Sequence, residues 1–488
     1  MAIDDRTEEH LEHVELWNTV RAAIKGKYAV LSLVGEDGCL CSPMYKPTGT
    51  AANLDPRQKK YWSRGRYFNA TGRTFDALNG MIWSNDPVVE LPTKLNYMIE
   101  SADGFGTTLR DVVQVITNEV ATIGRYGALV DMPSVDTVPT IGEQESGAMS
   151  PRIIGYKAED IIYHRYQSGT KKLAEVRLAE LYEEATDDAD SRGLVNYEVK
   201  TQIRRLVLID GVYYNEVWRG KQRETQTQPK ANGSPLNVIP FYFFGADANT
   251  AEYGSIPAYD LASMNLGHFV LDCDNRDNLH YHGQGMTNIF TGADAHESES
   301  LNPNGLDVGA KGKNQFLPGD RVEVLQIEAT GAIPAEMLRD QERMVMLGAQ
   351  LVQDVNSNVT LGAKEMEFGA STATLRRVSR NVSIGVEWLL GMAGIYLADA
   401  GDIQYRLNED FVTDAMDAPM VAQHLAAIQA GALPGASFFD TARKVGFTNK
   451  EDQELEDELD TESAGIEPMG EGDAIAQAAA DAGELDAE

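Results

Sequence analysis

A polar, glycine-rich segment, residues 283–332, separates two stretches whose apolar residues have helical spacing. Pro257 can open the first helix, and Pro334 can open the second, because proline is well tolerated in the first helical turn. Two short strands are predicted between the helices, at 286–290 and 321–327. A small module inserted between two helices is an unusual plan for an enzyme, so this order favours a structural role.

The first of these helices changes character along its length. Leu261, Phe269 and neighbouring apolar residues indicate a partly buried start, whereas Asp272–Asn278 is polar all round and predicts a helix that leaves the protein body or bridges through solvent. Six side chains of metal-binding type lie here: His268, Asp272, Cys273, Asp274, His280 and His282. Their spacing does not converge on one site, so ion pairs such as Asp272–Arg276 are favoured over metal binding or catalysis.

Residues 107–123 have apolar side chains at steps of three and four, which predicts an amphipathic helix. Gly124 follows where a helix end needs a left-handed residue, and 128–130 is a short apolar run typical of a buried strand. The local prediction is therefore helix, tight turn and strand. Arg125 and Tyr126 in this turn are interpreted as structural rather than catalytic.

The remaining elements are predicted from the same kinds of pattern. The turn Asp210-Gly211 joins two alternating runs and indicates a β hairpin. Helices are expected at 10–25, 372–399, 418–430 and 437–445. Strands are expected at 173–184, 197–209, 212–219 and 403–407, a hairpin from 28–34 and 39–41, and loops at 222–235 and 356–369.

The formal net charge is −33, and it is unevenly distributed. Residues 451–488 contain 15 acidic residues and no Lys or Arg, which leaves −18 for the rest. This tail has no aromatic residue and is expected to be disordered. An acidic body argues against tight nucleic-acid binding, which depends on Lys and Arg. No signal peptide or membrane span is expected, and three cysteines do not indicate a disulfide framework.

Motifs for catalysis are weak. No Gly-x-x-x-x-Gly-Lys-Ser/Thr phosphate loop is present. The sequence 103–108 has the glycines of a partial dinucleotide motif but is better explained as a helix cap, and Cys39 and Cys41 have no second pair. Three arginines, Arg376, Arg377 and Arg380, form a basic helix face. They are expected to contact neighbouring acids, with DNA or another subunit as the alternative.

Several segments, in order, resemble those of bacteriophage portal proteins. The first ones are Phe68–Trp83 followed by Leu91-Pro92, the turn Gly124–Pro133, and Tyr156–Arg165. Later ones are Leu261–Phe269, Gln341–Val352, Leu407–Phe411 and the predicted final helical pair around Gly431. The resemblance extends over roughly residues 60–460, and the order and spacing of its pieces make it specific.

The resemblance implies an α+β fold with the wing, stem, clip and crown of a portal, combining long helices, a β-rich wing and a small β clip. The implied boundaries are 1–256 for the N-terminal region and wing, 257–283 and 333–355 for the stem helices, 284–332 for the clip, 356–369 for a tunnel loop, 370–415 for a wing helix and strand, 416–450 for the crown and 451–488 for the tail.

The resemblance also implies a function without catalysis, metal or cofactor: a ring, commonly a homododecamer, at one capsid vertex of the virion, assembled in the host cytoplasm. Genome DNA would pass through it during packaging and ejection, without sequence-specific binding. The implied partners are the terminase large subunit, the head-to-tail adaptor, and the major capsid and scaffolding proteins. The alternatives are another phage capsid or tail protein and, less favoured, a metal-dependent enzyme.

The resemblance implies two sets of functional side chains, one in the tunnel loop and one in the clip. The tunnel-loop set would line the channel, and the clip set would dock partners. The tunnel-loop set is Asn358, Thr360, Lys364, Glu365 and Glu367. The clip set is Glu297, Glu299, Asp307, Lys311 and Lys313.

Overall fold

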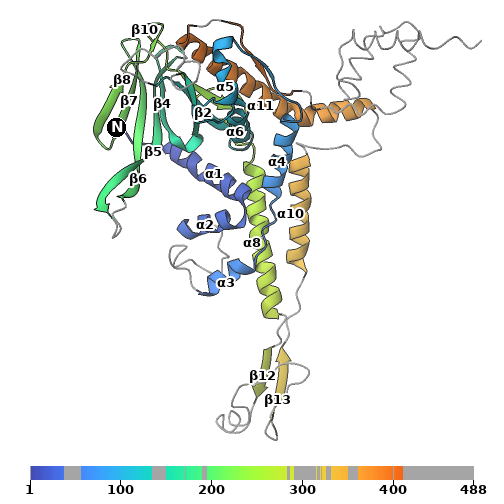
Figure 1. The fold of residues 1–488 in the computed structure, drawn as a ribbon. Helices are drawn as coiled ribbons and strands as arrows, with labels where there is room; N and C mark the ends of the chain where they lie inside the picture. Colours follow the sequence, from blue (N-terminus) through green and yellow to red (C-terminus); the bar gives the residue numbers. More distant parts are fainter. Residues whose placement is uncertain are drawn as a thin grey trace, which may run out of the picture. The chain divides into compact units, whose positions relative to one another are not determined.

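A computed structural model of the chain describes residues 2–37, 56–133, 150–170, 172–189, 195–282, 286–290, 321–325, 331–349, 361–398 and 401–409, with residues 315, 319 and 411. The chain divides into two units, Met1–Glu409 and Asp410–Glu488, and all the described helices and strands lie in the first. This unit is α+β, with antiparallel sheets beside helices (Figure 1). The predicted class is confirmed, whereas the predicted helices at 418–430 and 437–445 lie outside the described residues.

The larger sheet is antiparallel, with its strands in the order β4-β5-β6-β7-β8. Its strands are β4 (Ile161–Tyr166), β5 (Leu173–Ala189), β6 (Val195–Ile209), β7 (Val212–Arg219) and β8 (Gln222–Thr227). The turn between β6 and β7 has φ values of 50° at Asp210 and 79° at Gly211, as a primed hairpin turn requires. The predicted strands and hairpin are confirmed.

The predicted loop at 222–235 is wrong. Most of it forms β8 and the short strands β9 (Lys230–Ala231) and β10 (Ser234–Pro235), which pair with each other. β8 is almost fully exposed and has no apolar pattern, yet β7 supplies its hydrogen-bond partners at the sheet edge. A neighbouring strand here outweighs weak local propensity.

A second sheet has the order β11-β2-β3 and follows α6 (Leu109–Thr122). Its strands are β2 (Arg125–Asp131), β3 (Arg152–Lys157) and β11 (Phe241–Gly245). The predicted helix, turn and strand are confirmed: Gly124 has φ 80°, and every residue of β2 is buried. A Cβ atom on Gly124 would lie 2.1 Å from the Ser255 carbonyl oxygen, so close packing also requires glycine.

The N-terminal segment is helical. α1 (Glu8–Lys25) confirms the predicted helix at 10–25, and Thr7 Oγ1 caps it by accepting a hydrogen bond from the His10 N–H. The predicted hairpin from 28–34 is wrong, because α2 (Lys27–Asp37) continues from Gly26 and packs against α1. Its Ala and Leu residues favour helix, and Val30 is fully buried. Cys39 and Cys41 lie outside the described residues.

Short elements connect these parts: α3 (Pro56–Arg64), α4 (Ala70–Ile82), β1 (Val88–Glu90), η2 (Thr93–Leu95), α5 (Tyr97–Glu100) and η3 (Ala158–Asp160). The loop 103–107 that precedes α6 is an internal turn, since Asp103 Oδ1 accepts hydrogen bonds from the N–H groups of Phe105 and Thr107. Thr108 then caps α6 through the Asp111 N–H. These contacts support the capping interpretation of 103–108.

The C-terminal part of the first unit contains α8 (Tyr259–His282), β12 (Met286–Phe290), β13 (Arg321–Leu325), α10 (Ala332–Ala349), α11 (Leu361–Tyr396) and β14 (Gln404–Arg406). Both predicted strands between the helices are present and pair with each other. The loop predicted for 356–369 is wrong from residue 361 onward, because Ala, Lys, Glu and Met start α11 there. None of the described helices is long and apolar enough to cross a membrane.

Candidate functional site

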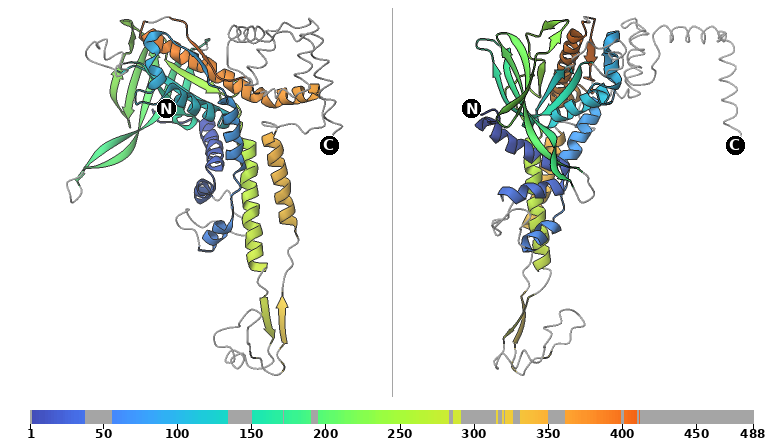
Figure 2. Two further views of the ribbon diagram at one scale, coloured as in Figure 1. Left: turned by 45° about the vertical axis from the view of Figure 1, so that its right-hand side comes forward. Right: turned by 60° about the vertical axis from the view of Figure 1, so that its left-hand side comes forward.

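The candidate site is the helix–hairpin segment, defined as α8, β12, β13 and α10. The chain leaves α8 into β12 and returns from β13 into α10, and the two helices lie side by side (Figures 1 and 2). At 1.5 Å per residue, α8 is about 36 Å long and α10 about 27 Å. An antiparallel hairpin therefore joins two long helices, which suits contacts with other chains more than an enclosed active site.

The polar half of α8 is packed against α3 and the residues after it, so the prediction of a helix polar all round and open to solvent is wrong. Phe269 and Cys273 are fully buried, and the Trp62 ring stacks on Phe269 with centroids 6.0 Å apart. Asp272 accepts hydrogen bonds from the Arg66 N–H at 2.6 Å and from Arg276 Nε at 2.8 Å. The predicted Asp272–Arg276 ion pair is thus present, but it is largely buried.

Two further acids on α8 have partners from α3. The Tyr61 hydroxyl donates to Asp274 Oδ1 at 2.6 Å, and Arg64 forms an ion pair with Asp277. Sequence reasoning missed these contacts between α3 and α8 because the partners are 213 residues apart in the chain. Local periodicity contains no information about contacts over such a separation.

Tyr61→Phe is expected to destabilise the first unit by about 1 kcal/mol, because Asp274 loses a hydrogen bond while the ring stays buried. Calorimetric melting of the variant would measure the change. Tyr28→Phe is the matched control, since Tyr28 is highly exposed, and it should leave the melting temperature unchanged. Equal stability of the wild type and Tyr61→Phe would mean that α3 does not cover α8 in solution.

The metal-like side chains on α8 do not form a ligand set. Burial raises the pKa of the Cys273 thiol to about 12, which keeps it protonated and unreactive at neutral pH. Burial also lowers the pKa of His268, whose ring contacts Gln341 on α10 at 3.1 Å. Among the described residues, no group of three or more His, Cys, Asp or Glu side chains is placed to hold a metal ion.

α10 packs against α8 and leaves part of its apolar surface exposed. Met344 is buried, and Gln341 contacts His268 of α8. Three large apolar residues are open to solvent: Leu338, Val345 and Met346 are 58%, 64% and 63% exposed. We call these three residues the outer stripe. Uncovered apolar side chains that lie close together on one helix are a candidate interaction site.

The outer stripe was missed by sequence reasoning, although a signal was present. Apolar residues occur on two sides of 334–349, which is more than one neighbouring helix can cover. Charged residues between them pair within the helix, as Arg343 does with Asp340 at 3.5 Å and with Glu336 at 3.6 Å. The stripe is therefore flanked by charges that are already largely compensated.

The predicted site residues have different outcomes. Arg376 Nε donates to the Glu409 carbonyl oxygen at 3.1 Å, Arg377 pairs with Asp247 at 2.9 Å, and Arg380 is exposed. Lys364, Glu365 and Glu367 lie in the first turns of α11. Asn358, Thr360 and the clip set (Glu297, Glu299, Asp307, Lys311 and Lys313) lie outside the described residues.

Arg125, from the turn after α6, is a structural residue. Its guanidinium is buried, donates to the Ala251 carbonyl oxygen at 2.5 Å, and stacks on the rings of Tyr253 at 4.5 Å and Phe243 at 5.0 Å. Burial lowers its pKa to about 10. The structural interpretation of this turn is supported, because the arginine connects β2 to the chain after β11.

Comparisons with known proteins add the following. Residues 257–397 match a family model described as a domain of unknown function (DUF4055). One similar solved structure is "Neck of empty GTA particle computed with C6 symmetry", at 13% identity and a TM-score of 0.40, over 85% of this chain and 99% of that chain. Another is "Virion of native gene transfer agent (GTA) particle", at 12% identity and a TM-score of 0.38, over 78% of this chain and 91% of that chain. No curated protein matches.

Proposed function

We propose that this protein is a portal protein: about twelve copies form a ring at one capsid vertex, and genome DNA enters and leaves through it. The observation that carries the proposal is the helix–hairpin segment with its uncovered outer stripe. Leu338, Val345 and Met346 are exposed although α10 packs against α8, so a further partner can cover them. The segment-by-segment resemblance of the sequence to portal proteins supports the same assignment.

The geometry of such a contact favours a ring. If the outer stripe of one copy packs on a different surface of the next, the contact is heterologous, and repeated heterologous contacts close into rings or continue as filaments. Burying three large apolar side chains contributes about 1.5–3 kcal/mol each when burial is complete. Each subunit in a closed ring makes two such contacts, so individually modest interfaces give a stable assembly.

The proposed roles of the other parts follow from this placement. The hairpin module at 284–332 would dock the terminase large subunit and later the adaptor, through residues such as Glu297 and Lys311. Capsid and scaffolding proteins would contact the wing. A net charge of −33 would keep DNA from adhering as it slides, because tight binding needs phosphate neutralisation. Lys364 and its neighbours would line the passage, at the start of α11 rather than in a loop.

A different capsid or tail structural protein is the second candidate, since it would also have an acidic surface and exposed apolar contacts. The segment-by-segment resemblance of the sequence to portal proteins favours the portal over this second candidate. An enzyme has less support, because the buried Cys273 and the paired acids of α8 are held in structural contacts.

Negative-stain imaging with sedimentation velocity tests the proposal. Purified protein is expected to form closed rings, with a mass of roughly 640 kDa for twelve chains of 53.4 kDa. Open tubes would favour the second candidate. A single monomeric species at every concentration would reject both structural roles.

A further inference from the structure

A β ribbon extends from the larger sheet beyond its neighbouring strands. β4 pairs with β5 only as far as Leu178, and β7 pairs with β6 only from Ile203. The β5–β6 pairing continues past these limits to Ala185 and Tyr197, so the outer part has two strands only (Figures 1 and 2). A two-stranded ribbon by itself is marginally stable in water, which makes its exposed surface informative.

One face of this ribbon carries three large apolar side chains that are uncovered, beside Glu183 and Thr201. The register pairs Leu181 with Thr201, Glu183 with Val199 and Ala185 with Tyr197, so Leu181, Val199 and Tyr197 share a face. Their exposed fractions are 75%, 60% and 63%. We call these three residues the ribbon face. Alternation of apolar and polar residues normally marks a strand with one buried side, yet this side is open.

The opposite face of the ribbon is polar and already paired. Lys200 Nζ contacts Glu184 at 2.6 Å and Glu198 at 3.2 Å, and Arg204 Nε donates to Glu180 at 2.6 Å. The charged side chains of the polar face therefore have ion-pair partners within the chain. The ribbon face, in contrast, needs a surface from another molecule to cover it.

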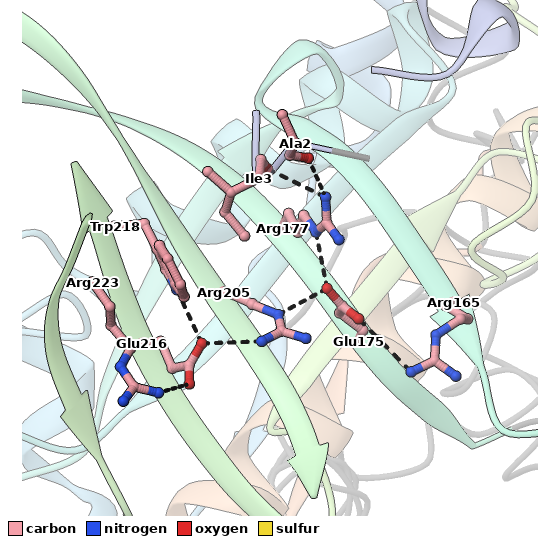
Figure 3. A network of polar contacts seen from close by, with 9 residues as sticks. All are labelled: Ala2, Ile3, Arg165, Glu175, Arg177, Arg205, Glu216, Trp218 and Arg223. Atoms are coloured by element: carbon pink, nitrogen blue, oxygen red, sulfur yellow. Dashed lines mark hydrogen bonds and ion pairs between the residues drawn. The ribbon is translucent and has the colours of Figure 1, made fainter. Parts of the chain in front are cut away.

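The strand register places a network of arginines on the same face of β5 and β6 as the ribbon face. Figure 3 shows this network. Glu175 Oε1 accepts from Arg177 Nε and Arg205 Nε, each at 2.9 Å, and Arg165 lies 3.7 Å from its other oxygen. Glu216 accepts from Arg205 at 3.2 Å, from Arg223 at 2.9 Å and from the Trp218 indole at 3.0 Å.

This arginine network has a positive excess. Burial alone raises the pKa of Glu175, but hydrogen bonds from Arg205 and Arg177 outweigh it and lower the pKa below its usual value, so the carboxylate stays ionised. Within the network four arginines face two carboxylates, a net charge of +2, and Glu183 on the adjoining ribbon face lowers the total to +1. Arg165 and Arg223 are about half exposed, so the excess is accessible.

We propose that the ribbon face and the adjoining arginine network dock a second copy of this chain, the neighbouring subunit of the proposed ring. The occupant follows from charge. Residues 1–450 carry −18 even without the acidic tail, so acidic side chains predominate on the surface of another copy and attract this locally positive sheet face. The apolar ribbon face then supplies burial beside the electrostatic contact. The inference rests on the proposed function, because only an assembly of copies provides this neighbour.

DNA is the competing occupant and fits less well. Its affinity would come from uncompensated cations meeting phosphates, and here two of the four positive charges are cancelled by Glu175 and Glu216. The three large apolar side chains beside the arginines cannot bind a phosphate backbone. A protein surface can contact both the apolar side chains and the arginines.

Photo-cross-linking in the full-length protein tests the contact directly. A benzophenone amino acid replaces Tyr197 on the ribbon face or, as the matched control, Glu198 on the opposite face. Isotopically light and heavy protein are mixed before irradiation, so that mixed-mass products identify cross-links between copies. We expect such products from position 197 and at least about fivefold fewer from position 198.

A variant set measures the strength of the contact. Leu181→Thr, Tyr197→Thr and Val199→Thr together remove the apolar face but keep strand propensity. We expect at least a tenfold rise in the concentration for half-assembly, about the effect of losing one apolar anchor. The control combines Glu184→Thr, Glu198→Thr and Lys200→Thr on the opposite face, and a change of less than about twofold is expected. Circular dichroism confirms that both variants keep the fold.

The outcomes separate this inference from the proposed function. Intact rings in the ribbon-face variant, with cross-links from position 197 confined to one chain, would overturn the inference and leave the ring. Cross-links between copies in assemblies that are not rings would support the contact and reject the portal assignment. Cross-linking to an added 30-base-pair DNA duplex instead of protein would overturn the inference, and monomers without cross-links would overturn both.

Discussion

Replacing the outer stripe of α10 by glutamine is expected to dissociate the assembly into folded monomers. Leu338, Val345 and Met346 are all more than half exposed, so Leu338→Gln, Val345→Gln and Met346→Gln together should cost the single chain little. Glutamine has a helix propensity close to that of leucine and methionine and better than that of valine. In the assembled state, by contrast, three apolar side chains lose their buried environment at every interface.

The expected size of this effect follows from burial. A loss of about 1 kcal/mol for each partly buried side chain gives about 3 kcal/mol at an interface, which raises its dissociation constant roughly 100-fold. Sedimentation velocity over a dilution series measures it. The matched control is Leu11→Gln on α1, where a half-exposed leucine lies outside the helix–hairpin segment and no change is expected.

Two results would contradict this prediction. Unchanged assembly of the triple variant would show that the outer stripe is not an interface. Loss of helical circular dichroism would instead show that these residues belong to a core of the single chain.

Mild acid is expected to destabilise the first unit, because two histidines are buried in their neutral form. Burial lowers the pKa of His10 to about 4, with Arg6 and Arg125 adding to the effect, and it lowers that of His164 to about 4, with Arg125 and His10 contributing. Glu159 acts in the opposite direction on His10 but is outweighed. Both rings lie beside Tyr253, which also stacks on Arg125, so protonation would place further positive charge next to a buried guanidinium.

The sign of the pH dependence follows from these pKa values. Each histidine has a folded-state pKa below its unfolded value of about 6.5, so its contribution to stability is complete above pH 6.5. The contribution is lost as the pH falls towards 4, because the unfolded chain binds the proton first. At pH 5 the loss is about 1–2 kcal/mol for each ring, or about 3 kcal/mol together.

Calorimetric melting at pH 8, 7, 6 and 5 checks this prediction, and a fall of several degrees is expected for the wild type by pH 5. His10→Gln combined with His164→Gln should remove most of the slope, because these two rings no longer take up protons, and His268, whose pKa burial also lowers, leaves a smaller slope. The double variant is expected to be less stable than the wild type at pH 8. Hydrogen exchange should place the first opening at α1, which carries His10. A wild-type melting temperature that does not change between pH 7 and pH 5 would rule out burial of these rings.

Several features were predictable because they depend on residues close in sequence. The helix α6, the left-handed Gly124 and the strand after it follow from apolar spacing and from glycine's tolerance of positive φ. The Asp210-Gly211 hairpin follows from turn chemistry. The two strands between α8 and α10 follow from short apolar runs between polar segments. The resemblance-based roles in the clip and tunnel loop remain predictions.

Most of the wrong predictions have one cause, a partner outside the segment itself, whereas residues 361–369 are helical through their own Ala, Lys, Glu and Met residues. The segment 28–34 has Val and Tyr residues that suit a strand, but packing on α1 makes it a helix. β8 is a strand because β7 lies beside it. Asp272 is buried because Arg66 and Arg276 satisfy its carboxylate.

The sequence by itself determined the local conformations and the charge: helical and alternating periods, the glycines that allow turns, and an acidic total of −33. The tertiary structure alone decided which apolar faces are covered. Met344 and Val345 are adjacent in α10, yet one is buried and the other is exposed. Leu178 and Leu181 differ in the same way along β5. The physical reason is that a side chain's own pattern creates the need for burial, whereas burial itself requires a second surface brought close by the fold.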